Sequence, residues 1–257
     1  MTDMPETDSQ PAKEDDLLTI IVPCLNEEGA IAETIADILA VAPTLPMPIK
    51  IWMVDDGSTD NTRAVMESLC ERHPECNMRV NPRNMGIGRT VLSTYEVIDP
   101  SSWVTVIPGD NEFRFESIHN FMKLRHDHDV VLGYFGNPII RTFTRRMASN
   151  AFRSLACLLY GYNFRYLNGM KMYRLWAFQG IEVKSGGFAY NAELVAKAIL
   201  RNPNLRIGEA PFVARGRAAG STTAFKPKAI LRAVRELNRG VQSVHEYRLA
   251  VIRAEDS

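Results

Sequence analysis

Runs of β-branched and other apolar residues alternate with stretches of helical periodicity, and this alternation constrains the fold more than any other feature of the sequence. The apolar runs are Leu18–Val22, Ile49–Val54, a short run near Met78–Val80, Trp103–Ile107 and Asp129–Leu132. The stretches with apolar residues three and four apart are Glu27–Leu39, Asp60–Arg72, about Arg89–Ile98 and Glu116–Arg125. This order predicts an α/β fold with a mostly parallel sheet and helices on both faces, in which ligands bind beyond the carboxyl ends of the strands.

Composition and charge narrow the class of protein further. The 257 residues are 46% hydrophobic, and 30 basic residues balance 30 acidic ones, so we expect a globular chain and no nucleic-acid partner. The four cysteines form no C-x-x-C pair, which favours neither a disulfide framework nor zinc and indicates a reducing, cytoplasmic compartment. Six acids and one lysine fall within the first sixteen residues, as in a disordered tail rather than a signal peptide. Because no apolar run approaches the roughly 18 to 20 residues of a membrane span, we expect at most a peripheral position on the inner face of a membrane.

Polar segments follow four of the predicted strands at their carboxyl ends. They read PCLNEEGA, DDGSTDNT, NPRNMGIGRT and PGDNEF, and all are rich in carboxylates, asparagine and glycine. Each segment alone also fits a turn followed by a helix cap. Four of them at one edge of one sheet favour a ligand site.

These segments, in this order and spacing, resemble the nucleotide-sugar-binding half of family 2 glycosyltransferases. The resemblance implies the GT-A fold, a Rossmann-like sheet with helices on both faces. Farther along, DVVLGYFGN, the arginine-rich stretch 141–153, NGMKMYR, GGFAYNAELVAKAI and RGRAAGST are similar to the dolichyl and polyprenyl phosphate sugar transferases of that family. The match covers about residues 18–228 and is more specific for the family than for the sugar or acceptor.

The resemblance implies a metal-dependent inverting hexosyltransferase that uses a GDP- or UDP-hexose donor. The implied contacts to base, ribose and donor phosphates are Pro23, Leu25, Glu27, Asp55 or Asp56, Arg83 and Gly86. Glu27 alternatively serves to stabilise the N-terminus of the following helix. The glycines of NMGIG also allow a tight entry to a helix, and they do not match a dinucleotide fingerprint.

The segment PGDNE departs from the Asp-x-Asp pattern of the family, because Pro108 stands where the first Asp is expected. Asp110 aligns with the second, metal-binding Asp, and Glu112 aligns with a later oxygen ligand. Two carboxylates at this spacing suit Mg²⁺ or Mn²⁺, which would keep waters and donor phosphates as further ligands. The alternative is a turn in which Asn111 adopts a tolerant conformation.

A basic segment points to the acceptor. Between Arg141 and Arg174 there are seven Arg or Lys residues and no acid, with apolar residues interleaved. Such a helix suits the interface of an anionic membrane, although it also suits a solvated helix packed on the core by one face. Arg145 and Ser149 match the lipid-phosphate clamp of the family, and Arg217 matches its R-x-x-G-x-S loop over the diphosphate.

The sequence is therefore compatible with three alternative functions. The first is transfer to a polyprenyl phosphate at the cytoplasmic membrane face, with Asp110, Arg145 and Arg217 in the catalytic machinery. The second is transfer to a glycan or small-molecule hydroxyl, with Glu193 as general base. The third is an inactive sugar-nucleotide-binding scaffold, which is suggested by Pro108 at the position of the first Asp of the family's metal-binding motif. We expect a disordered acidic tail over 1–16, a catalytic domain over 17–225 and a basic amphipathic helix over 226–257. The last helix could pack on a second copy of the chain, so a homo-oligomer is one possible assembly.

Overall fold

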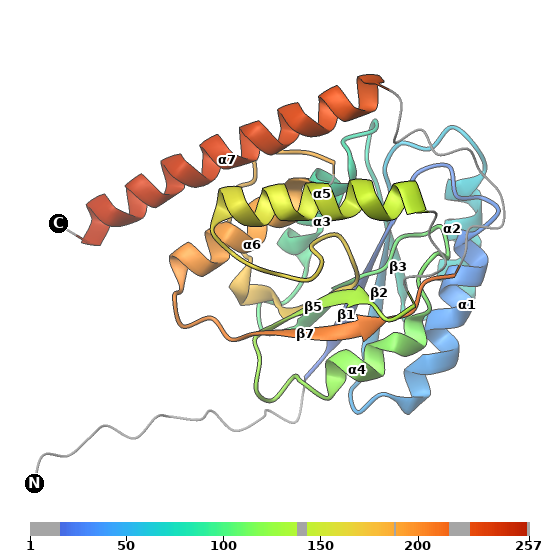
Figure 1. Ribbon diagram of the computed structural model, residues 1–257. Coiled ribbons are helices and arrows are strands. Elements are labelled where there is room, and N and C mark those ends of the chain that lie inside the picture. The colour runs from blue at the N-terminus through green and yellow to red at the C-terminus, as the bar shows by residue number, and fades with distance from the viewer. Residues whose placement is uncertain (1–15, 138–142, 188, 216–226, 256–257) are drawn as a thin grey trace, which may run out of the picture.

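The computed structural model describes residues 16–137, 143–187, 189–215 and 227–255, and a seven-stranded sheet lies at its centre (Figure 1). The strands are β1 (Leu18–Cys24), β2 (Ile49–Asp55), β3 (Cys76–Val80), β4 (Trp103–Val106), β5 (Val130–Phe135), β6 (Lys171–Arg174) and β7 (Ile207–Phe212). Their order is β3-β2-β1-β4-β6-β5-β7, and every neighbouring pair is parallel except the two that β6 makes with β4 and β5. The predicted mostly parallel sheet is therefore confirmed.

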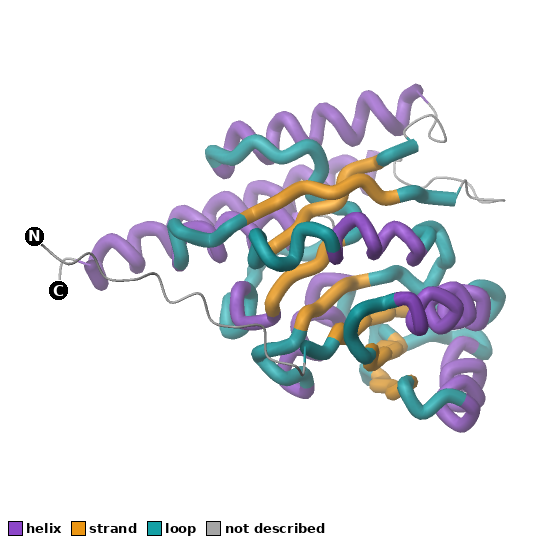
Figure 2. Tube along the Cα trace, turned by 90° about the horizontal axis from the view of Figure 1, so that it is seen from below, coloured by secondary structure: helices purple, strands orange, loops and turns teal. Residues whose placement is uncertain are grey.

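Helices cover both faces of the sheet (Figure 2). They are α1 (Ile31–Val41), α2 (Thr62–Arg72), α3 (Ile87–Thr94), α4 (Ile118–Met122), α5 (Phe143–Tyr160), α6 (Ala189–Arg201) and α7 (Pro227–Glu255), with 3₁₀ turns at Ala42–Thr44, Tyr95–Val97, Phe115–Ser117 and Leu175–Ala177. Side chains of α1, α2 and α4 join the core on one face, and those of α3 and α6 join the core on the other. Helices α5 and α7 pack with α6 around a third, smaller cluster. None of the described helices has a stretch long and apolar enough to cross a membrane.

The central strand shows why the apolar runs form this sheet. All seven residues of β1 are buried. Ile20 and Val22 pack into the core beside α1, and Ile21 packs into the core on the opposite face. A strand that is apolar on both sides can be satisfied only where helices cover both faces, which is the arrangement of an α/β sheet.

Several elements differ from the expectation based on sequence, among them α1 and β6. Helix α1 begins at Ile31 rather than Glu27, because the amides of residues 26–28 donate to side chains of residues 58–62 after β2. Strand β6 is not indicated by the apolar pattern, since its four residues begin with Lys171 and end with Arg174. Its antiparallel direction places its first residue, Lys171, toward the carboxyl edge of the neighbouring strands, opposite Leu132 of β5.

Candidate active site at the carboxyl edge of the sheet

The loops after β1 and β2 are joined by reciprocal hydrogen bonds. Asn26 Oδ1 accepts from the Thr59 amide at 2.8 Å, and Glu28 Oε2 accepts from the Asn61 amide at 2.8 Å. In return, the Glu27 amide donates to Thr62 Oγ1 at 2.7 Å. These contacts hold the two segments that the sequence assigns to the base and ribose of a nucleotide as one platform.

The two adjacent aspartates at the end of β2 have different surroundings. Asp55 Oδ1 accepts a hydrogen bond from the Ser58 amide at 2.8 Å. Asp56 is buried, as Asp55 is, and its two carboxylate oxygens accept from the amides of Met85 and Gly86 at 2.9 Å each, while Asn81 donates a third bond. Asp56 therefore shapes the loop after β3, and any effect of this residue on a donor includes an effect through that loop.

Glycine is required where the loops after β2 and β3 meet. Gly57 has a φ of +79°, and a Cβ built there would lie 2.6 Å from the carbonyl carbon of Arg83. Gly86, with a φ of +84°, directly precedes α3, as expected of a tight entry to a helix. The predicted site residues Arg83 and Gly86 thus lie on a loop that is held by hydrogen bonds to Asp56 and packed closely against Gly57.

The loop after β4 carries the candidate metal ligands. The Gly109 amide donates to Pro23 O at 3.1 Å, and Thr34 Oγ1 of α1 donates to Gly109 O at 3.0 Å. Asp110 Oδ1 accepts from the Glu112 amide at 3.1 Å. Asn111 between them has a φ of +53°, so the loop has the tolerant turn conformation that the sequence suggested as the alternative, and it also places both carboxylates on one short turn.

The electrostatic environment of this edge favours a cation. Cys24, at the end of β1, has its thiol pKa raised by burial first and then by the negative charges of Glu27, Asp55 and Asp110. Carboxylates from three separate segments thus contribute negative charge around the end of β1. Among the described residues no group of three His, Cys, Asp or Glu side chains is arranged to hold a metal ion. A pair of carboxylates fits Mg²⁺ or Mn²⁺ shared with donor phosphates and waters better than a metal held by protein alone.

An arginine that sequence reasoning did not select fixes this loop from the other half of the sheet. The Arg215 amide, just after β7, donates to Glu112 O at 2.6 Å. Its guanidinium donates to the Asn111 side chain and pairs with Asp37 of α1 at 2.9 Å. Arg217, two residues farther along, lies outside the described residues.

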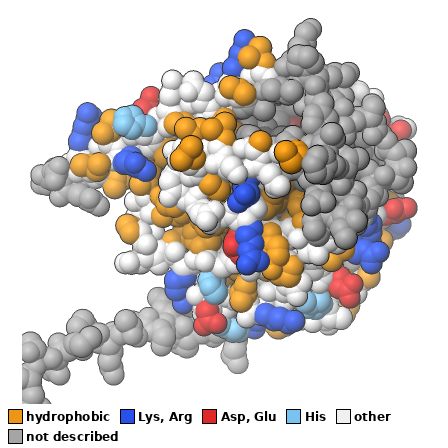
Figure 3. Space-filling view, viewed as in Figure 1, with side chains coloured by type: hydrophobic (Ala, Val, Ile, Leu, Met, Phe, Trp, Pro, Cys, Tyr) orange, Lys and Arg blue, Asp and Glu red, His pale blue; other side chains and the backbone are white. Residues whose placement is uncertain are grey.

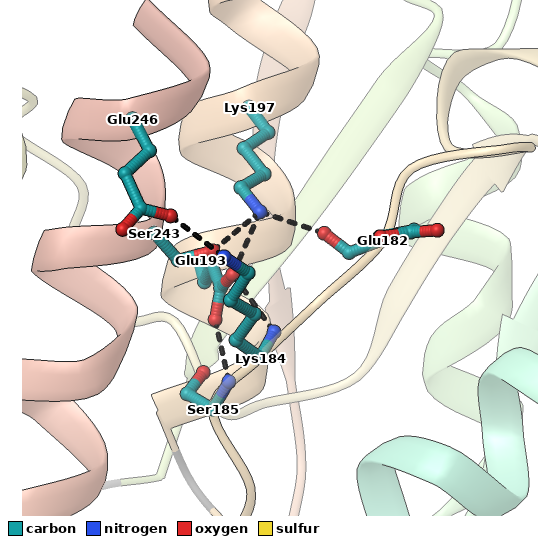
Figure 4. A network of polar contacts seen from close by, with 7 residues as sticks. All are labelled: Glu182, Lys184, Ser185, Glu193, Lys197, Ser243 and Glu246. Atoms are coloured by element: carbon teal, nitrogen blue, oxygen red, sulfur yellow. Dashed lines mark hydrogen bonds and ion pairs between the residues drawn. The ribbon is translucent and has the colours of Figure 1, made fainter.

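Glu193 lies inside a polar network rather than beside the strand-end carboxylates (Figure 4). Its side chain is fully buried, pairs with Lys197 at 2.8 Å and accepts from the amides of Lys184 and Ser185 at 3.0 and 2.8 Å. Burial raises the pKa of this carboxyl, but the hydrogen bonds from Lys197, Ser185 and Lys184 outweigh burial and lower the pKa overall. A buried carboxylate with a lowered pKa and both oxygens bonded is poorly suited to act as a general base.

Helix α5 contains two of the predicted acceptor residues. Ser149 is half-buried, whereas the Arg145 side chain falls outside the described part of the helix. The outer side of α5 exposes Met147, Leu155 and Leu158, the last of these with 79% of its surface accessible. Hydrophobic side chains are correspondingly visible over α5 on the face shown in Figure 3.

Lys171 is a second residue that the sequence did not single out. It is buried at the carboxyl edge, and its Nζ donates to the carbonyls of Gly169 at 2.9 Å and Leu167 at 3.3 Å. Burial lowers its pKa to about 7. The position follows from the antiparallel direction of β6, which only the folded sheet reveals.

Comparison with known proteins places this geometry in a family. Residues 19–198 match the model of glycosyl transferase family 2. The chain belongs to this family. Its relatives include an undecaprenyl-phosphate 4-deoxy-4-formamido-L-arabinose transferase of Shewanella sediminis, 22% identical over 60% of this chain and 50% of that protein. Another is the uncharacterized glycosyltransferase YkoT of Bacillus subtilis, 29% identical over 54% of this chain and 44% of that protein, so the chain spans about half the length of these curated relatives.

Solved structures agree with the family on the fold. Glucosyl-3-phosphoglycerate synthase of Mycobacterium tuberculosis, in complex with Mn²⁺, UDP and glucosyl-3-phosphoglycerate, has a TM-score of 0.60 at 14% identity, covering 98% of this chain and 86% of that one. The UDP complex of the same synthase has a TM-score of 0.65 at 13% identity, covering 89% and 80%. The sequence-based assignments to family 2 and to the GT-A fold are confirmed.

Within this family 2 fold, the structure brings together one part of the predicted site. Pro23 and Asp55 lie at the carboxyl ends of β1 and β2, and the loops that follow β1 and β4 carry Leu25, Glu27, Asp110 and Glu112. Leu25 is 39% exposed. Arg215 and Lys171 escape sequence reasoning because their importance arises from contacts between strands far apart in the chain. The functional roles of the predicted residues stay predictions.

Proposed function

We propose that this family 2 chain transfers a hexose from a nucleotide diphosphate sugar to a polyprenyl phosphate, with inversion at the anomeric carbon. The convergence of Glu27, Asp55 and Asp110 around the end of β1 carries this proposal. A cluster of carboxylates at the carboxyl edge of a parallel sheet suits a donor that arrives with a divalent cation. The Shewanella sediminis relative is an undecaprenyl-phosphate sugar transferase, which supports the choice of a polyprenyl phosphate acceptor.

The donor half of the site consists of three strand-end loops. The backbone around Pro23 and Leu25 would contact the base, and Asp55 the ribose. Asp110 and Glu112 would hold Mg²⁺ or Mn²⁺, which when bound neutralises charge on the departing diphosphate. Arg217, which follows Arg215 by two residues, would act on the same diphosphate. Neither GDP nor UDP is favoured by the described contacts.

The reaction would be a single displacement. An oxygen of the lipid phosphate attacks the anomeric carbon, the bond from that carbon to the diphosphate breaks, and the nucleoside diphosphate leaves with its electron pair. A phosphate monoester has a second pKa of about 6, so its oxygen is already anionic near neutral pH and needs no strong base. The enclosure of Glu193 by Lys197 and two amides is compatible with this acceptor and unfavourable for a hydroxyl acceptor that relies on Glu193.

The acceptor would approach along α5. Arg145 and Ser149 would receive its phosphate, while the exposed Met147, Leu155 and Leu158 face the interface of an anionic membrane. The basic excess of the segment 141–174 suits headgroups of opposite charge.

An assay that separates transfer from donor hydrolysis tests this function. Arg145→Ala should impair transfer to undecaprenyl phosphate and spare slow metal-dependent hydrolysis of the donor. The matched control is Arg153→Ala, two turns farther along α5, where the guanidinium donates to Phe164 O at 3.4 Å and has no assigned part in the reaction. Binding to anionic liposomes should weaken with salt, because exposed charges are screened within about 10 Å at 0.1 M. Wild-type protein that ignores such liposomes and transfers no sugar to undecaprenyl phosphate would overturn the lipid acceptor, whereas full transfer by Arg145→Ala would overturn the role of Arg145.

A further inference from the structure

The chain that leaves β7 pairs with the loop after β4, although β6 and β5 separate these two strands in the sheet. The Arg114 amide donates to Val213 O at 3.0 Å, and the Arg215 amide donates to Glu112 O at 2.6 Å. These two bonds run in opposite directions between antiparallel segments. The backbone of one candidate metal ligand, Glu112, is therefore bonded directly to the end of β7.

The guanidinium of Arg215 extends this contact to α1, which lies on the side of the molecule toward which β7 points (Figure 1). Its Nη2 pairs with Asp37 Oδ1 at 2.9 Å. Its Nη1 donates to the side-chain oxygen of Asn111 and, at 3.5 Å, to Asn111 O. The other oxygen of Asp37 accepts from the Phe115 amide at 3.0 Å. Asp37 thus joins Arg215 to the far end of the loop after β4.

Helix α1 also holds the beginning of this loop. Thr34 Oγ1 donates to Gly109 O at 3.0 Å, and Asn111 Nδ2 donates to Glu33 Oε2 at 3.1 Å. Asn111 has a φ of +53°, a conformation that few residue types other than glycine adopt readily. Its side chain is bonded by Glu33 and by Arg215. The turn around this asparagine is therefore held both by α1 and by the end of β7.

We infer that Arg215, through its pair with Asp37, is a positioning residue for the candidate cation ligands Asp110 and Glu112. The inference rests on the proposed function, in which these two carboxylates hold Mg²⁺ or Mn²⁺. Side chains that orient metal ligands typically contribute about tenfold to hundredfold in metal affinity. Arg215 acts through the turn and not as a ligand, because a guanidinium has no acceptor to offer a cation.

Charge and geometry make opposite predictions for Arg215. A positive side chain near a cation site repels the cation, so removal of the charge alone would tighten cation binding. Loss of positioning would instead weaken cation binding. A lysine keeps the charge but lacks the planar fork that reaches Asp37 and Asn111 together. Arg215→Ala and Arg215→Lys therefore separate the two effects.

Arg206 offers a matched control at the opposite end of β7. It directly precedes the strand, and its guanidinium bonds Asp129 through Nε at 3.2 Å and through Nη2 at 2.8 Å. This pair also joins an arginine beside β7 to an aspartate of another part of the sheet. It lies at the amino end of the strand, whereas the loop after β4 meets the carboxyl end.

The experiment measures Mn²⁺ binding to the full chain by electron paramagnetic resonance of the free ion, alone and with UDP or GDP. Arg215→Ala should raise the Kd for Mn²⁺ about tenfold, because the turn that carries both carboxylates loses its support. Arg215→Lys should restore little of this loss, and Arg206→Ala should resemble the wild type. Wild-type affinity in either Arg215 variant, or tighter binding by Arg215→Ala, would overturn the inference.

Hydrogen exchange tests the positioning without any ligand. The amides of Glu112 and Phe115 should exchange faster in Arg215→Ala than in the wild type or in Arg206→Ala, and unchanged rates would overturn the inference. If Arg215→Ala loses Mn²⁺ affinity but the wild type transfers no sugar, the proposed function fails and the inference stands. Wild-type protein that binds no Mn²⁺, even with UDP and GDP, would overturn both.

Discussion

The donor edge and the layer of α5, α6 and α7 are built by different means. At the donor edge, loops after β1, β2 and β4 hold one another through contacts such as Thr59 N–H to Asn26 and Gly109 N–H to Pro23. In the helical layer, a fully buried ion pair between Glu193 and Lys197 fixes a segment that has no regular structure. Short polar turns at strand ends can be recognised in the sequence as local motifs. Charged contacts between distant residues have no such motif, so the layer of α5, α6 and α7 is understood only from the fold.

The largest effect should come from breaking the buried ion pair. Glu193→Ala leaves Lys197 charged and enclosed, and loss of one partner of a buried pair destabilises a protein by about 3–5 kcal/mol. Urea unfolding should show this loss. Because the folded-state pKa of Glu193 is lowered, its contribution is present above the unfolded pKa near 4.5 and is lost as pH falls through the folded value. Glu193→Gln with wild-type stability and no transfer would instead support the general base.

The two aspartates at the end of β2 sharpen the comparison within the donor edge. Asp56→Ala removes acceptors from two amides and from Asn81, so we expect a loss of about 2–3 kcal/mol and weaker nucleotide binding. Asp55→Ala removes the bond from Ser58 and should lower stability by about 1 kcal/mol. Thermal unfolding and calorimetry on both variants measure the contrast. Equal stability losses would show that Asp56 does not organise the loop after β3.

A pH-dependent effect, smaller for each pH unit, is expected at Lys171, where the sheet meets the helical layer. Its pKa of about 7 lies below the ordinary 10.5, so between these values the unfolded state binds more protons and stability rises with pH. Lys171→Met removes this dependence. Relative to wild type, the variant should therefore lose about 1.4 kcal/mol for each pH unit between 7 and 9. Parallel stability curves for the two proteins over this range would contradict a buried, titrating lysine.

Much of the fold follows from sequence because each part of the donor edge is local. An apolar run that is followed by Asp55-Asp56-Gly57 predicts a strand and then a turn, and the polar residues after the turn predict the start of the next helix. The same reasoning cannot place Lys171, since an antiparallel β6 between β4 and β5 is decided by pairing across the chain. It also selects Glu193 for its helical position and misses the enclosing Lys197, because that pair matters only once α7 covers it.

Titration calorimetry of UDP and GDP in the presence and absence of Mn²⁺ tests the central claim that the loops at the carboxyl edge bind a nucleotide and a cation together. Wild-type protein should bind one of these nucleotides with Mn²⁺ and more weakly without it. Asp110→Ala should lose the Mn²⁺ dependence at unchanged thermal stability, and Glu112→Gln should keep part of it, because an amide oxygen still coordinates. Wild-type protein that binds neither nucleotide with Mn²⁺, or an Asp110→Ala variant that binds as the wild type does, would contradict the account.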